Sequence, residues 1–283
     1  MLSVVIPTYN TAEMTLRCVR AIRGADEVIV VDDGSTDDTA ALLSRDARVI
    51  FLGANHGFAV AANRGVAEAR GDLILLLNSD AIVAPDALAA FVAAFENDPK
   101  LGVAGAQLLN EDGSTQWSGG RTPTLPWIAG VVSGAGHFAR IFRRRGPEGP
   151  RHTEWVSGAA MMFRRDVWKP LDERYLFYCQ DIDFCLGAQK TGWRVRIVDE
   201  ARVTHAHGRT IAPGSELSYD PARMWPDLLT WGRNHYGESW AFRARIILIA
   251  VAALRIAWRK ARFKNAAAMV RGLKGLLTAL RRT

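Results

Sequence analysis

Polar and acidic side chains follow short apolar runs in the first part of this 283-residue chain, and their types suit nucleotide chemistry. Asp32-Asp33-Gly34-Ser35 follows one run, and Asn78-Ser79-Asp80 follows another. A carboxylate such as that of Asp33 can accept the imide N–H of uracil or thymine. A hard divalent cation prefers oxygen ligands and bridges phosphates, which is a candidate role for Asp80. The pattern therefore indicates a site for a nucleotide together with a divalent cation.

Two further groups, Pro7-Thr8-Tyr9-Asn10 and Asn55-His56-Gly57, would add an aromatic ring and amides to this site. Each group alone is a weak signal, because Asx and Gly residues close strands routinely. In open parallel sheets, however, ligands bind beyond the carboxyl ends of the strands, so four such groups would lie along one edge. The sequence contains neither GxGxxG nor GxxxxGK[ST], which argues against a dinucleotide enzyme and a P-loop NTPase.

The apolar runs have the length and composition of strands buried on both faces, as in a parallel sheet. They cover residues 2–7, 27–32, 48–52 and 72–77. The segments between these runs are predicted to be helices. They are expected over residues 11–24, after a Ser35 cap, over 57–70 and from Pro85. Further strands are expected at 102–109 and 155–164, a helix from Gln180, and a strand pair at 194–198 and 201–207. Residues 119–151 are expected to form long loops with some short structure. This alternation predicts an α/β fold with a mainly parallel sheet.

The composition favours a globular protein and disfavours several other classes. Hydrophobic residues make up 49% and charged residues 23%, which is typical of a globular protein and too apolar for disorder. The three cysteines form no CxxC pair, which disfavours a disulfide scaffold and a cysteine zinc site. The chain starts with a strand-like run and no basic leader, so we expect a cytoplasmic protein.

Charge is distributed unevenly along the chain. Residues 241–283 hold eleven Lys and Arg and no Asp or Glu, whereas the rest holds 25 basic and 29 acidic residues. The apolar run at 246–254 has nine residues, and a bilayer-spanning helix needs about 20. Apolar residues among Lys and Arg favour a helix in the membrane interface. A buried helix with a solvated basic face is the alternative.

Eight segments, in this order, resemble a family 2 glycosyltransferase of the GT-A fold, in particular the bacterial branch that includes rhamnosyltransferases. They are SVVIPTYN (3–10), VDDGSTDDT (31–39), N-x-G-F-x-x-A-x-N-x-G (55–65), ILLLNSD (74–80), WVSGAAMMFRRDVW (155–168), YCQDIDFC (178–185), GWRV (192–195) and VTHAHGRT (203–210). The resemblance implies a GT-A catalytic domain over residues 1–215. Residues 216–283 would form a helical, basic C-terminal extension that associates with membranes.

The resemblance also implies roles for individual residues. Asp33 would read the nucleotide base. Asp80 would bind the metal, Mg²⁺ or Mn²⁺, and His205 would complete the metal shell, with His207 as a nearby alternative. The remaining residues expected around the nucleotide and donor sugar are Pro7, Tyr9, Asn55, Gly57, Asn63, Asn78, Ser79 and Gly158.

Asp181 matches the general base of an inverting transfer. On a helix, Asp181 and Asp183 would point about 200° apart, so only one can face the site, and we favour Asp181. Apart from the resemblance, Asp181 would be read as an acidic residue that offsets a helix dipole. Two positions depart from the family pattern, because Gln180 stands where glutamate is usual and Asn78 replaces the first aspartate of Asp-x-Asp.

The resemblance implies an inverting, metal-dependent glycosyltransferase that moves L-rhamnose or a similar sugar from a dTDP- or UDP-sugar. The acceptor would be a saccharide or a polyprenyl-linked saccharide in cell-envelope polysaccharide synthesis. The enzyme would lie on the cytoplasmic face of the inner membrane through residues 241–283, with no nucleic-acid partner. One alternative is a non-catalytic nucleotide-sugar-binding protein, which Gln180 and Asn78 favour. Another is a nucleic-acid binder that uses the basic tail.

Overall fold

The computed structural model describes residues 1–43, 46–133, 153–206, 220–262 and 265–280. The chain divides into two compact units. The first comprises Met1–Arg121, Gly146–Glu173 and Gln180–His207, and the second comprises Thr122–Arg145, Arg174–Cys179 and Gly208–Thr283. The domain boundary expected at residue 215 lies outside the described residues.

The first unit is built on an eight-stranded sheet with the order β3-β2-β1-β4-β9-β6-β10-β5. Parallel pairs join β1 to β2 and β4, β2 to β3, and β6 to β10, whereas β9 and β5 run antiparallel to their neighbours. The expected α/β fold with a mainly parallel sheet is therefore confirmed. The strands are β1 (Leu2–Thr8), β2 (Glu27–Asp32), β3 (Arg48–Phe51), β4 (Leu73–Leu77), β5 (Ala81–Val83), β6 (Leu101–Leu109), β9 (Ala160–Arg164) and β10 (Arg194–His205).

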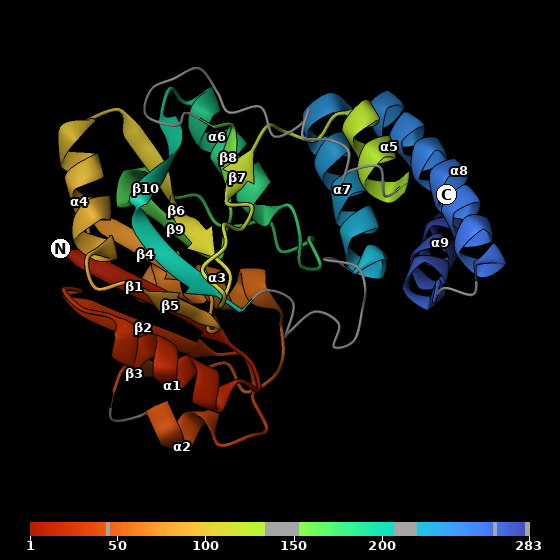
Figure 1. Cartoon of the computed structure of the whole chain (residues 1–283). Helices are drawn as coiled ribbons and strands as arrows, with labels where there is room; N and C mark the ends of the chain where they lie inside the picture. The colour runs from red at the N-terminus through yellow and green to blue at the C-terminus, as the bar shows by residue number, and fades with distance from the viewer. Residues whose placement is uncertain (44–45, 134–152, 207–219, 263–264, 281–283) are drawn as a thin grey trace. The chain divides into compact units, whose positions relative to one another are not determined.

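Helices flank this sheet (Figure 1). They are α1 (Ala12–Ala21), α2 (Thr39–Leu43), α3 (Phe58–Glu68), α4 (Ala87–Asn97) and α6 (Gln180–Lys190). Helix α3 packs against β1 and β2, and α4 packs against β10 and β6. Every residue of β1 is buried, which explains its unbroken apolar sequence. Two smaller features complete the first unit. They are a two-stranded sheet of β7 (Gly119–Gly120) and β8 (Trp155–Val156) and a short 3-10 helix, Arg165–Val167.

Several sequence-based boundaries are wrong for identifiable reasons. The strand expected at 155–164 is interrupted, because residues 157–159 turn between β8 and β9. The strand pair expected at 194–207 is one strand, β10, whose pairing with β6 shifts between Val198 and Arg202. The helix expected after Ser35 begins at Thr39, whose amide donates to the Asp37 carboxylate (3.1 Å). The stretch expected to be mainly loops contains helix α5 (Leu125–Ser133).

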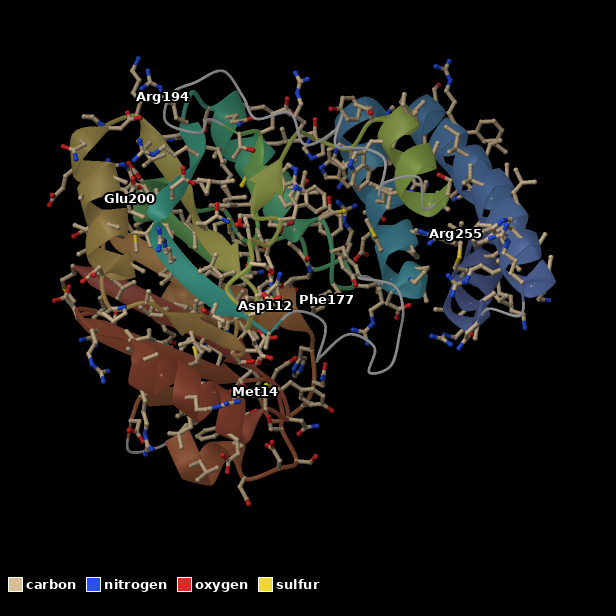
Figure 2. The ribbon with its side chains drawn as sticks, in the orientation of Figure 1. Met14, Asp112, Phe177, Arg194, Glu200 and Arg255 are labelled. Carbon is tan, nitrogen blue, oxygen red and sulfur yellow. The ribbon has the colours of Figure 1, made fainter. Side chains whose placement is uncertain are left out.

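The regular elements described in the second unit are all helices. They are α5, α7 (Pro221–Tyr236), α8 (Glu238–Ala261) and α9 (Ala267–Leu280). Helix α7 packs against α8 and α9, and α5 packs against α8 (Figure 1). Arg255 of α8, labelled in Figure 2, donates to the carbonyl oxygen of Val132 in α5 (2.7 Å). Among the helices that the structure describes, none is both long and apolar enough to cross a bilayer.

Candidate active site

Backbone and hydroxyl hydrogen bonds join the ends of three neighbouring strands, β2, β1 and β4. The Asp33 amide, just after β2, donates to the carbonyl oxygen of Thr8 at the end of β1 (2.9 Å). The Thr8 hydroxyl lies 2.8 Å from that of Thr11, which donates to the Ser79 hydroxyl after β4 (3.1 Å). The predicted convergence of these strand ends is therefore present. The cluster of Thr8, Thr11 and Thr15 was not predicted from the sequence, although positions 11 and 15 lie one helical turn apart.

Asp33 is 4% exposed and holds the loop after β3. Its two carboxylate oxygens accept the amides of His56 and Gly57, each at 2.8 Å. Gly57 has a φ of +97°, a left-handed conformation that suits glycine and turns this amide toward Asp33. The His56 Nδ1 atom also lies 3.7 Å from the Oδ1 atom of Asp33. Base recognition by Asp33 stays a prediction.

The other residues expected around the base lie on the same strand ends. Pro7 is buried, Asn55 is exposed, and the Tyr9 ring is 41% exposed, so the ring is available to a ligand. Asn63 differs, because its side-chain amide donates to the Leu171 carbonyl (3.0 Å) and accepts the Leu171 amide (2.7 Å). Its side chain thus holds residue 171 in place, and its expected role toward the donor remains a prediction.

Asp80 and His205 meet where β4 ends and β10 ends. The Asp80 Oδ1 atom lies 3.3 Å from His205 Nε2, and both side chains are at most 10% exposed. The Asn78 side-chain nitrogen lies 3.4 Å from the same Nε2 atom. Asn78, Asp80 and His205 are therefore brought together as the sequence predicted, whereas His207 lies outside the described residues.

Gln116 determines which nitrogen of His205 faces Asp80. Its side-chain oxygen lies 3.1 Å from His205 Nδ1, and its side-chain nitrogen donates to the His205 carbonyl (2.6 Å). An amide oxygen only accepts, so Nδ1 is the atom that donates to Gln116, and Nε2 is the ring nitrogen that faces Asp80. Gln116 was not predicted from the sequence, because a single glutamine after a turn carries no signal of a contact 89 residues away.

These residues fit a divalent cation. A lone pair and a carboxylate that face each other repel unless a cation or a proton lies between them. Throughout the described residues, no three His, Cys, Asp or Glu side chains are gathered as a metal site. Mg²⁺ in nucleotide sites commonly takes one or two carboxylates, with substrate phosphates supplying further oxygens, so a small protein ligand set is sufficient.

Asp181 lies in the first turn of helix α6, and its side chain contacts the turn between β8 and β9. Its Oδ2 atom accepts the Gly158 amide (3.0 Å), and its Oδ1 atom accepts the Ile182 amide (2.8 Å). Burial raises the pKa of the Asp181 carboxyl above its usual range, and the two amide donors oppose this shift. Ala159, next to Gly158, accepts the Asn78 amide (3.0 Å). A short path of contacts thus connects Asp181 to the segment that carries Asp80.

Gln180, where the family pattern has glutamate, is 4% exposed. A carboxylate at this buried position would lose hydration and would repel the carboxylate of Asp181. The amide avoids both costs, so the substitution is compatible with an ionisable Asp181.

Residues 3–171 match the family model "Glycosyl transferase family 2". The chain belongs to glycosyl transferase family 2. Over 247 residues it is 29% identical to an N-acetylglucosaminyl-diphospho-decaprenol L-rhamnosyltransferase of Mycobacterium tuberculosis, covering 77% of this chain and 80% of that protein. It is 33% identical over 226 residues to the O-antigen biosynthesis protein RfbC of Myxococcus xanthus, covering 70% of this chain and 17% of the larger protein.

Solved glycosyltransferase structures share the fold of this family 2 protein. TarS 1-349 of S. aureus has a TM-score of 0.53 at 18% identity, with 87% of this chain and 69% of that chain covered. The mannosyltransferase PcManGT of Pyrobaculum calidifontis, in complex with GDP-Man and Mn²⁺, has a TM-score of 0.52 at 17% identity, with coverage of 98% and 85%. The expected GT-A fold and glycosyltransferase class are confirmed.

Proposed function

We propose that this glycosyltransferase moves L-rhamnose from a dTDP- or UDP-activated donor to a saccharide or polyprenyl-linked saccharide, with inversion at the anomeric carbon. The Mycobacterium tuberculosis relative, by its name an L-rhamnosyltransferase acting on a diphospho-decaprenol-linked sugar, supports this sugar and this acceptor class. The observation that carries the mechanism is the Asp181 carboxylate, held by Gly158 beside the segment of Asn78 and Asp80.

An inverting transfer is a single displacement at the anomeric carbon. The acceptor hydroxyl oxygen forms a bond to that carbon while the bond to the nucleoside diphosphate breaks on the opposite face. Asp181 accepts the hydroxyl proton, and its raised pKa makes it a stronger base than an ordinary aspartate. Asp80 and the Nε2 atom of His205 are the residues that would hold Mg²⁺ or Mn²⁺ near the diphosphate. When bound, the ion supplies Lewis-acid stabilisation of the leaving group.

The test compares the wild type with Asp181→Asn, using dTDP-rhamnose and UDP-sugars and a polyprenyl-diphosphate-linked saccharide. We expect transfer by the wild type with Mg²⁺ or Mn²⁺ and an anomeric configuration opposite to that of the donor, as read by NMR. Asp181→Asn should lower kcat about 10³-fold or more while still binding the donor. Retained configuration, or near-normal turnover by Asp181→Asn, would contradict the mechanism. Donor binding without transfer or hydrolysis would support the non-catalytic alternative.

We also propose that the second unit binds the cytoplasmic face of the inner membrane through α8. At about 100° per residue, Phe242, Ile246, Leu254 and Trp258 spread over an arc of about 160° on one half of the helix, and each is at least 48% exposed. Basic residues surround this face, and residues 241–283 contain no acidic residue. An apolar face among cations suits a surface of anionic lipids.

A further inference from the structure

One face of helix α7 contacts a single short segment of the chain. This face consists of Asp220, Arg223 and Asp227, and the segment consists of residues 176–178, with Phe177 labelled in Figure 2. Asp227 is 1% exposed. Its Oδ1 atom accepts the Leu176 amide (2.7 Å), and its Oδ2 atom accepts the amides of Phe177 (2.8 Å) and Tyr178 (2.7 Å).

A second contact ties the same segment to the start of α7. The Tyr178 hydroxyl accepts the Asp220 amide (2.9 Å), while the Asp220 side chain caps the helix by accepting the Ala222 amide (3.0 Å). Burial raises the pKa of Tyr178 to about 12, so the hydroxyl keeps its proton. The Arg223 guanidinium lies 6.0 Å from the centre of the Phe177 ring. These contacts fix the segment at both its backbone and its side chains.

Burying the Asp227 carboxylate costs hydration free energy, which hydrogen bonds must offset. Burial raises the pKa of Asp227, whereas the three amide donors favour its charged form. Three successive backbone amides bound by one carboxylate impose one conformation on residues 176–178. The next residue, Cys179, has a φ of +68°, which non-glycine residues adopt only when their surroundings impose it. The chain then enters α6 at Gln180, directly before Asp181.

We propose that Asp227 is a positioning residue for the general base. By fixing residues 176–178 it sets the path by which the chain enters the first turn of α6, which carries the Asp181 carboxylate. The inference rests on the proposed role of Asp181 and extends it to the C-terminal helices.

The experiment uses the full chain and compares Asp227→Asn with Leu229→Ala. Leu229 lies on the same helix, is 4% exposed, and serves as the control for destabilisation of α7. At a temperature where both variants are folded, Asp227→Asn should lower kcat at least about tenfold more than Leu229→Ala, since small misplacements of a base have large effects. The KM for the donor should stay unchanged. Hydrogen exchange should be faster at the amides of residues 176–178 in Asp227→Asn alone.

Equal kcat losses in the two variants would overturn the proposal, as would unchanged exchange at residues 176–178. If Asp227→Asn does not fold, Tyr178→Phe tests the same clamp by removing the acceptor of the Asp220 amide, and an unchanged kcat in that variant would also overturn it. Asp181→Asn, measured in parallel, separates this inference from the proposed function. Normal turnover by that variant refutes Asp181 as the base, whereas the exchange data report the Asp227 clamp independently of activity.

Discussion

At the scale of single residues, the environment of Asp181 decides how it works. An aspartate at the start of a helix is commonly an acidic group that offsets the helix dipole. Here the Gly158 amide fixes one carboxylate oxygen, and burial raises the pKa of the group. The neutral neighbour Gln180 adds no repulsion. These features make Asp181 a buried, fixed carboxyl group beside the Gly158 turn.

The first prediction concerns the pH dependence of the wild type and of Gln180→Glu. A protonated Asp181 cannot accept a proton, so kcat falls as the pH drops through its pKa, and the raised pKa places this fall at a higher pH than for an ordinary aspartate. Gln180→Glu adds a neighbouring carboxylate, which should raise the pKa further and move the acidic limb of kcat upward. A limb that stays in place or moves downward in steady-state assays would refute the electrostatic argument.

The second prediction concerns Gln116, which orients His205. Gln116→Leu removes both hydrogen bonds to His205 and should weaken Mn²⁺ binding in the presence of dTDP or UDP by about 10–100-fold. Titration calorimetry measures this affinity directly. Gln189→Leu is the matched control, because its amide donates to the Thr153 carbonyl (3.1 Å) and has no contact with His205. Equal Mn²⁺ affinities in the two variants would exclude an orienting role for Gln116.

At the scale of elements, the loops beyond β1, β2 and β3 form one structure. Asn10 accepts the Thr36 amide (2.8 Å) through its side chain, and its own amide donates to the Ser35 hydroxyl (2.9 Å). The loop of Gly34 also approaches the backbone of Ala54 so closely that no side chain fits between them. The candidate nucleotide site therefore depends on contacts between loops as well as on the sheet.

The third prediction uses Gly34→Ala and Gly24→Ala. Both glycines have φ near +80°, which costs a non-glycine residue about 1–2 kcal/mol. At Gly34 an added Cβ would also lie 2.4 Å from the Ala54 backbone, whereas at Gly24 nothing lies within 4 Å. In urea unfolding, Gly34→Ala should thus lose about 3 kcal/mol or more, clearly exceeding the loss in Gly24→Ala. Similar losses would show that the loops move apart easily.

The elements that the sequence predicted well are those with a local signal. Unbroken apolar runs such as residues 2–7 identified the parallel strands, because burial on both faces requires them. Helix α5 lies where long loops with some short structure were predicted, and its position was not, since its Gly- and Pro-rich surroundings resemble a loop. The division of β10 was wrong, because a change of pairing with β6 is a property of two strands together.

In the candidate site, too, only residues with a local sequence signal could be predicted. The strand-end residues Asn78 and Asp80 could be predicted, since parallel strands bring their ends together. Gln116 and Asp227 could not, because each acts on residues about 50 to 90 positions away and has no distinctive neighbours in the sequence. The family resemblance supplied Asp181, which the residues alone did not distinguish.

At the scale of the whole molecule, the C-terminal helices are more than an appendage. Helix α8 packs against α5, and Arg255 binds the α5 backbone, so residues 122–145 and 208–283 belong to one unit. Deleting residues 241–283 would remove this partner of α5 as well as the exposed face of α8. Surface substitutions are therefore the better test of membrane binding.

The fourth prediction replaces Ile246, Leu254 and Trp258 with serine together. This variant should lose sedimentation with phosphatidylglycerol vesicles while its kcat on a water-soluble acceptor stays near that of the wild type, because the three residues are exposed. Phe51→Ser with Ile82→Ser is the control, since both residues are exposed in the first unit. High salt or pure phosphatidylcholine should also weaken wild-type binding. Undiminished sedimentation of the triple variant would place the lipid contact elsewhere.

The hold of α7 on residues 176–178 sets a rule for building chimeras of such enzymes. The family match ends at residue 171, so a natural place to join two homologues would be just after it. A graft made there would take both the segment and its clamp from one parent and could keep them matched. A junction at residue 215 would instead pair one parent's segment with the other's α7, and the hybrid would fold its sheet yet turn over slowly.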